Sequence, residues 1–145
     1  MHSKPRIPHT KVPSPETLSI PVAKWALETT KDNMQEIYDE SGYMWDDDDK
    51  REELMEHGGA ARFLVAREAS EEAGKLGRPV AFVHFRFSLQ GEAVGCLGGQ
   101  PCLYIMDIQI EKVSQRKGLG RHLVRTLEVC LQKAPNVIYG IVESL

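Results

Sequence analysis

The sequence contains little cysteine and no long apolar run. Its three cysteines (Cys96, Cys102 and Cys130) are odd in number and form no Cys-x-x-Cys pair, which excludes a disulfide framework and a cysteine-based metal site. No stretch approaches the roughly 18 apolar residues of a membrane-spanning helix, and the first 21 residues hold no apolar segment typical of a secretory signal. We therefore expect reduced thiols, no membrane partner, no metal, and a nuclear and cytoplasmic protein.

An excess of charge of one sign is also lacking. The formal net charge is only −3 over 145 residues, of which 41% are hydrophobic and 27% charged. This composition is that of one globular domain and not of a disordered chain, and we expect a monomer without direct nucleic-acid contact. The near-neutral total hides an asymmetry, because residues 46–56 hold seven acids and two basic residues, whereas residues 112–125 hold five basic residues and no acid.

Proline separates an arm from the rest of the chain. Five prolines within residues 1–21 remove backbone donors and predict an extended arm, and residues 22–145 form the domain. The spacing of apolar residues there predicts helices at 22–41, 47–57 and 119–131 and strands at 61–67, 79–89, 101–111 and 136–143. The last strand–helix–strand unit predicts a right-handed crossover between parallel strands, so the expected fold class is α/β (α+β).

A basic, glycine-containing segment joins the 101–111 strand to the 119–131 helix. Gly118 and Gly120 leave backbone N–H groups uncovered where a helix N-terminus also leaves its donors unpaired. Such a turn suits a phosphate or a pyrophosphate, and the surrounding basic residues agree with that interpretation. The spacing is neither a Walker loop nor a dinucleotide-binding fingerprint, and taken alone it fits a plain strand-to-helix turn equally well.

Two blocks of residues resemble a known family. Gln115-Arg116-Lys117-Gly118-Leu119-Gly120 resembles the Gln/Arg-x-x-Gly-x-Gly/Ala signature with which GNAT acetyltransferases hold the pyrophosphate of acetyl-coenzyme A. The segments Lys24–Tyr38, Trp45, Lys50–Leu54 and Pro79–Phe87 are similar to the NatD family of histone N-alpha-acetyltransferases within the GNAT group. The resemblance covers residues 23–131 and implies a mixed central sheet flanked by helices.

The resemblance implies a cofactor site and a general base. Acetyl-coenzyme A is the implied cofactor, and Asp107 stands where the family has a glutamate proposed as the general base. Backbone contacts to the thioester arm are implied for Ile108, Gln109, Ile110 and Glu111, and pyrophosphate contacts for Gln115, Arg116, Lys117, Gly118, Leu119, Gly120 and Arg121. The apolar residues that flank Asp107 in sequence predict a desolvated carboxylate, which is a stronger base.

The resemblance also implies a peptide site for a protein N-terminus that begins Ser-Gly-Arg-Gly, as in histone tails. Its aromatic members are Tyr38, Tyr43, Trp45 and Tyr104. Ser88 and Gln90 occupy the places of the acids with which the family grips the substrate arginine.

The residues alone leave several alternatives open. Asp107 also fits a structural ion pair or cap, Tyr38 and Trp45 fit core packing, and the acidic run fits a solvated helix face. Acetyl transfer to a lysine or a small amine is an alternative to N-terminal acetylation. The chain ends just after the expected fifth strand, where GNAT proteins continue with a further helix and strands. We therefore expect a C-terminally incomplete fold, and a catalytically dead form that only binds partners is a third reading.

Overall fold

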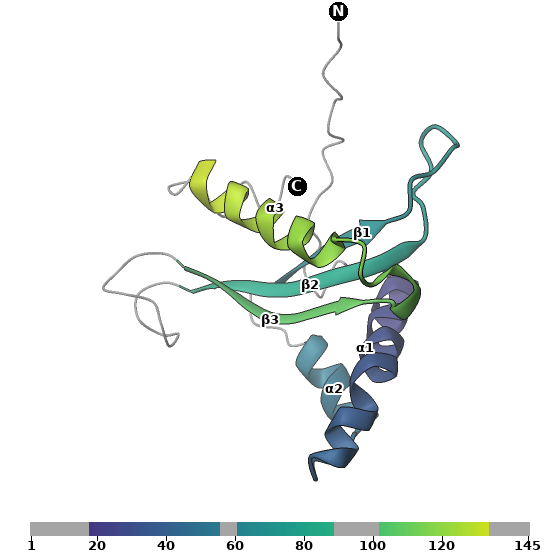
Figure 1. Cartoon of the computed structure of the whole chain (residues 1–145), viewed down its shortest axis with the longest axis vertical. Coiled ribbons are helices and arrows are strands. Elements are labelled where there is room, and N and C mark those ends of the chain that lie inside the picture. The colour runs from purple at the N-terminus through teal and green to yellow at the C-terminus, as the bar shows by residue number, and fades with distance from the viewer. Residues whose placement is uncertain (1–17, 56–60, 89–101, 134–145) are drawn as a thin grey trace, which may run out of the picture.

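The structure is a computed structural model that describes residues 18–55, 61–88 and 102–133 (Figure 1). Its elements are α1 (Ile20–Glu40), α2 (Asp47–Leu54), β1 (Ala61–Arg67), β2 (Pro79–Ser88), β3 (Cys102–Ile110), the 3-10 turn η1 (Lys112–Ser114) and α3 (Leu119–Lys133). The strands form an antiparallel sheet in the order β1-β2-β3. None of these helices is long and apolar enough to cross a membrane.

Most element boundaries agree with the sequence prediction, because each element is bounded by local turn chemistry. Helix α1 begins at Ile20, two residues before the predicted start, since Pro21 falls in the first turn, where a missing N–H costs nothing. Helix α2 ends at Leu54 and not at the predicted His57, which lies outside the described residues. The predicted strand 136–143, the arm up to residue 17 and Cys96 also lie outside them, as do the side chains of Cys102 and Cys130.

The central strand β2 is buried on both faces, so the molecule has three layers. Figure 1 shows α3 over one face of the sheet and α1 and α2 over the other. The α3 side is packed by Ala81, Val83, Phe85, Leu123 and Leu127, and the opposite side by Ala26, Leu54, Phe63 and Phe82. The alternation of β2 thus sends successive residues into two separate cores, each excluding water from one face.

The acidic start of α2 is a helix cap. Oδ1 of Asp46 accepts hydrogen bonds from the backbone N–H groups of Asp48 at 2.8 Å and Asp49 at 2.9 Å. These acids also interact favourably with the positive end of the helix dipole. The interpretation of the acidic run as a solvated helix face is therefore correct for the first three residues of α2. It fails at Lys50, which is buried against the sheet.

Candidate active site

An irregularity in β3 directs the side chain of the predicted base. His84 of β2 pairs with Asp107, whereas the next residue, Phe85, pairs with Ile105, so Met106 is an extra residue on β3. Such a bulge bends a strand and redirects its side chains. Because cross-strand partners share a face, Asp107 lies with His84 on the face covered by α1 and α2.

The Asp107 carboxylate lies in polar surroundings. Its side chain is 13% exposed, and its Oδ2 atom lies 3.3 Å from Nζ of Lys50. Its Oδ1 atom accepts a hydrogen bond of 2.7 Å from Nε2 of Gln109. Asp107 is thus largely withdrawn from water, as its apolar sequence neighbours predicted, but its neighbours in space are an ammonium and an amide.

Lys50 is a site residue that the sequence prediction missed. It lies in α2 one turn before Leu54, on the buried side of that helix, and its Nζ also donates to Oε2 of Glu53 at 2.9 Å. Burial alone lowers the pKa of an ammonium, but the Glu53 hydrogen bond and the Asp107 charge outweigh burial and raise the pKa of Lys50. Its four-residue spacing from Leu54 was the one available signal of its inward position.

A second amide extends this cluster to α1. Nδ2 of Asn33 donates to Oε1 of Gln109 at 3.0 Å and to the backbone carbonyl of Ile110 at 2.9 Å. The Gln109 side chain, which is buried, therefore faces α1. Only its backbone remains for the predicted contact with the cofactor.

The predicted aromatic residues of the peptide site lie partly together. The rings of Tyr38 and Trp45 contact each other with centroids 5.3 Å apart and planes inclined by 58°. Trp45 is anchored through its backbone N–H to Oδ1 of Asp39 at 3.0 Å and through its indole N–H to Oδ1 of Asp47 at 2.6 Å. Both rings are half-buried and belong to neither core. In the described part of the fold they are thus a surface-accessible pair and not core packing.

The other predicted substrate residues are more scattered. Tyr43 is highly exposed in the loop between α1 and α2. Tyr104 shares the face of Asp107 through its pairing with Arg86, whose guanidinium carbon lies 5.6 Å from the Tyr104 ring centroid. Ser88 ends β2, with its side chain outside the described set, and Gln90 lies outside the described residues.

The loop between β3 and α3 has the geometry of an anion cradle. Arg116 and Gly118 adopt left-handed conformations with φ of 63° and 80°, a turn that directs successive N–H groups to one side. A Cβ at Gly118 would meet nothing within 4 Å, so the space in front of it is open. At Gly120, by contrast, a Cβ would lie 3.3 Å from Cδ1 of Ile110, so this glycine lets α3 approach β3.

The environment of this cradle suits a pyrophosphate. Nε2 of Gln115 donates to the carbonyl of Ile110 at 3.0 Å and closes the turn. The five basic side chains of residues 112–125 (Lys112, Arg116, Lys117, Arg121 and Arg125) are all exposed. Leu119 and Arg121 belong to the first turn of α3, whose N-terminus favours negative charge. The cradle, the open space and the charges together fit the diphosphate of a coenzyme A molecule.

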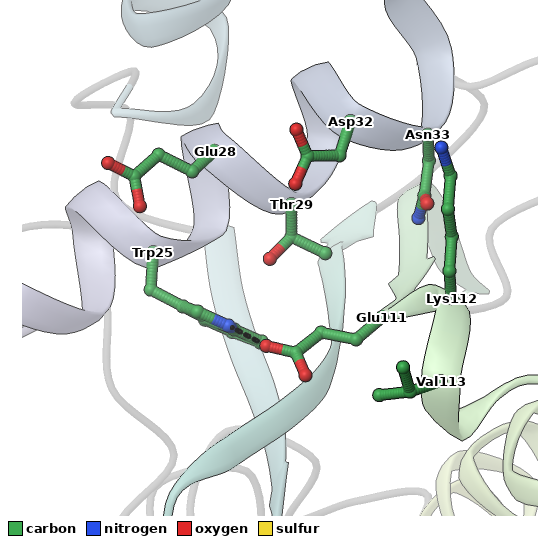
Figure 2. A pocket seen from close by; sticks show the side chains of 8 residues that line it. All are labelled: Trp25, Glu28, Thr29, Asp32, Asn33, Glu111, Lys112 and Val113. Atoms are coloured by element: carbon green, nitrogen blue, oxygen red, sulfur yellow. Dashed lines mark hydrogen bonds between the residues drawn. The ribbon is translucent and has the colours of Figure 1, made fainter.

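A pocket of about 330 Å³ separates α1 from the end of β3 (Figure 2). Its lining residues are Trp25, Glu28, Thr29, Asp32, Asn33, Glu111, Lys112 and Val113. Figure 2 shows the Trp25 indole meeting Glu111, with a hydrogen bond of 2.7 Å from Nε1 to Oε1.

Arg78 binds both oxygens of the Glu111 carboxylate at 2.7 Å. Burial favours the neutral acid, but these partners outweigh burial and lower the pKa of Glu111. Its side chain is thus engaged on the α1 side, and its backbone N–H and carbonyl are bonded to Val80 and Ser114, so no group of Glu111 is left open for the predicted cofactor contact.

Comparison with known families identifies the fold. The model of the acetyltransferase (GNAT) family matches residues 28–143. The chain belongs to this family. GNAT acetyltransferases generally use acetyl-coenzyme A, which agrees with the cradle at Gly118.

A solved structure supports the same fold for this GNAT chain. It is similar to Arabidopsis thaliana NAA60 in complex with a bisubstrate analogue, with a TM-score of 0.56 and 13% identity, over 81% of this chain and 66% of that one. It also matches a possible acetyltransferase from Clostridium difficile 630, with a TM-score of 0.49 and 17% identity, over 80% of this chain and 66% of that chain. The ribosomal-protein-alanine N-acetyltransferase of Brucella melitensis biovar Abortus matches with a TM-score of 0.49 and 20% identity, over 80% and 70% of the two chains.

The expected GNAT fold is therefore confirmed, with the described sheet wholly antiparallel and the predicted parallel strand outside the described residues. The chain spans slightly less than two thirds of the NAA60 structure. Among the described residues no group of His, Cys, Asp and Glu is placed to hold a metal ion.

Proposed function

We propose that this GNAT chain transfers the acetyl group of acetyl-coenzyme A to the α-amino group at the N-terminus of a protein. The observation that carries the proposal is the position of Asp107 on β3. Its carboxylate lies on the α1–α2 face and pairs with Lys50 of α2, the helix whose first turn holds Trp45 of the half-buried aromatic pair. The adjacent Ile108 is exposed on the opposite face, and the strand that bears both leads into the cradle at Gly118. The acetyl thioester and the accepting α-amine would therefore meet at the edge of β3.

Each residue has a defined part in this proposal. When bound, acetyl-coenzyme A supplies the acetyl group as a thioester, which is exchanged for an amide and a free thiol. The cradle of residues 115–121 holds the diphosphate, and backbone N–H groups near Ile108 polarise the acetyl carbonyl. Because an α-ammonium has a pKa of about 7.7–8.0, much of it is neutral near pH 7.5. Asp107 then accepts the proton that the amine loses as the amide forms, and a proton from solvent would convert the departing thiolate to the free thiol.

The substrate we propose is a histone-like N-terminus of the type Ser-Gly-Arg-Gly. The resemblance of residues 24–54 and 79–87 to histone N-alpha-acetyltransferases supports it. So does the run of seven acids in residues 46–56 next to the aromatic pair, since such a run attracts a basic peptide. Location in the nucleus and cytoplasm, and action as a monomer, belong to the same proposal.

Acetylation of a lysine or a small amine is the second candidate. The feature that favours it is the pair Ser88 and Gln90, which replaces the acids that would grip an arginine in the third position of the peptide. A carboxylate paired with that arginine would contribute more than neutral hydroxyl and amide groups.

The deciding experiment measures cofactor binding and transfer separately. Isothermal titration of acetyl-coenzyme A into the protein tests the cradle. Mass spectrometry then follows the peptide Ser-Gly-Arg-Gly-Lys, with the same peptide blocked at its α-amine as the matched control. Acetylation of the free peptide alone supports the proposal, and acetylation of both peptides favours lysine transfer. Cofactor binding without transfer to either peptide contradicts the proposed substrate and supports another amine or a binding-only form.

A further inference from the structure

Lys50 and Asp107 form an ion pair that joins α2 to β3 beneath the sheet. Lys50 is 8% exposed, and its Nζ lies 3.3 Å from Oδ2 of Asp107. A lysine this deeply buried loses its hydration, so its charge is maintained only by close anionic partners. Here Asp107 and Glu53 are those partners.

The pair belongs to a continuous polar chain that crosses three elements. It runs from Glu53 through Lys50 to Asp107, then through Gln109 to Asn33 of α1. The Gln109 amide donates a hydrogen bond to Oδ1 of Asp107, and Oδ2 faces the Lys50 ammonium as an ion pair without a hydrogen bond. The carboxylate therefore has little freedom to rotate away.

The same helix carries the peptide side of the site. Trp45 bonds to Asp47 in the first turn of α2, and Lys31 of α1 lies 3.0 Å from the same Oδ1 atom of Asp47. Helix α2 thus links the aromatic pair to the carboxylate through one rigid turn, from Asp47 to Lys50. A displacement of α2 would move Trp45 and the partner of Asp107 together.

We infer that Lys50 is a positioning residue for acetyl transfer: its ion pair with Asp107 fixes the place of that carboxylate relative to the peptide loop. The inference rests on the proposed function, in which Asp107 accepts the proton of the amine. Lys50 itself touches no reacting atom in this scheme. Its ammonium acts through the 3.3 Å ion pair, which holds the Asp107 carboxylate on the α1–α2 face.

The groups around Asp107 define what a pH experiment reports. Lys50 and Glu53 face it from α2, Asn33 comes from α1 through Gln109, and Tyr38 of α1 lies close enough to Lys50 to influence the pKa of that ammonium. From β2, His84 lies opposite Asp107, with its ring stacked at 4.5 Å on Phe63.

The test compares Lys50→Gln with Lys50→Arg and with Lys75→Gln as the control. The glutamine keeps length and a donor but removes the charge, the arginine restores it, and Lys75 is an exposed lysine of the β1–β2 loop. We expect Lys50→Gln to lower kcat on the Ser-Gly-Arg-Gly-Lys peptide by about tenfold or more, with KM for acetyl-coenzyme A unchanged. Lys50→Arg should recover most of kcat.

Two outcomes overturn the inference without touching the proposed function. One is an active wild type together with a folded Lys50→Gln variant of unchanged kcat. The other is measured on the wild type alone, so it applies even if the variant fails to fold. It is the finding that the ¹³C resonance of the Asp107 carboxyl and the ¹⁵N resonance of the Lys50 ammonium titrate independently of each other. A wild type that binds acetyl-coenzyme A, shows coupled resonances and acetylates no α-amine overturns the proposed function instead.

Discussion

The indole N–H of Trp25 donates to Oε1 of Glu111 at 2.7 Å, which ties the first turns of α1 to the residue that follows β3. Arg78 binds the same carboxylate from the start of β2 and also pairs with Glu68 at 3.2 Å. Three elements thus converge on one carboxylate at the point where the chain leaves the sheet and enters the cofactor loop.

This arrangement predicts a stability that depends on pH. The pKa of Glu111 is lowered from its ordinary value of 4.5, so its ionised form stabilises the fold above that value. The contribution is lost as pH falls through the lower folded pKa. We expect Glu111→Gln to lower the urea midpoint at pH 7 and to differ little from wild type near pH 3. A difference of the same size at both pH values would show that the carboxylate charge contributes nothing.

The cofactor cradle predicts a specific loss of binding at Gly118. Glu at this position places a negative charge and a side chain in the open space that faces the diphosphate, so binding of acetyl-coenzyme A should fall below detection in isothermal titration. Gly74 is a matched control, because it has a similar φ of 84° and equally open space but lies in the β1–β2 loop. Gly74→Glu should bind the cofactor as wild type does. Equal effects of the two substitutions would contradict the cradle.

The proposed base predicts a separation of turnover from binding. Asp107→Asn keeps the shape of the side chain but removes its capacity to accept a proton, so kcat should fall by roughly 10²–10⁴-fold. The dissociation constant of acetyl-coenzyme A should stay within about twofold, because the carboxylate faces the α1–α2 side. Steady-state kinetics and calorimetry on the same preparation measure both. Full turnover in Asp107→Asn would assign the base elsewhere.

The aromatic pair predicts a substrate effect. Trp45→Ala removes the ring against which Tyr38 packs. We expect KM for the peptide to rise by up to about tenfold while KM for acetyl-coenzyme A is unchanged, in line with about 0.5–1.5 kcal/mol for an aromatic contact. Leu76→Ala, at another exposed apolar residue remote from the site, is the control. A fall in kcat alone, without a change in peptide KM, would argue that Trp45 orders α2 and does not touch the peptide.

The acidic cap of α2 predicts a stability effect. Asp46→Ala removes the acceptor for two N–H groups, and should destabilise the fold by about 1 kcal/mol. Asp48→Ala is the comparison, since that exposed residue has no capping role. Urea denaturation of the two variants measures the difference, and similar midpoints would contradict the capping role of Asp46.

The sequence by itself determined the elements and the position of the cofactor loop. The alternation of β2 and the spacing of Leu123 and Leu127 in α3 are local patterns, so they can be read without knowing which elements pack against them. The glycines at 118 and 120 likewise specify a tight strand-to-helix turn through their own conformational freedom.

Only the tertiary structure decided the environment of Asp107. Met106 is one extra residue in a register set by pairing with β2, and Lys50 reaches Asp107 from a helix more than fifty residues earlier in the chain. An ion pair across such a separation leaves no periodic pattern in the sequence, because each partner looks like an ordinary polar residue in its own segment. Whether that carboxylate is solvated, neutral or paired depends on how α2 packs beneath the sheet, and packing is a property of the assembled layers.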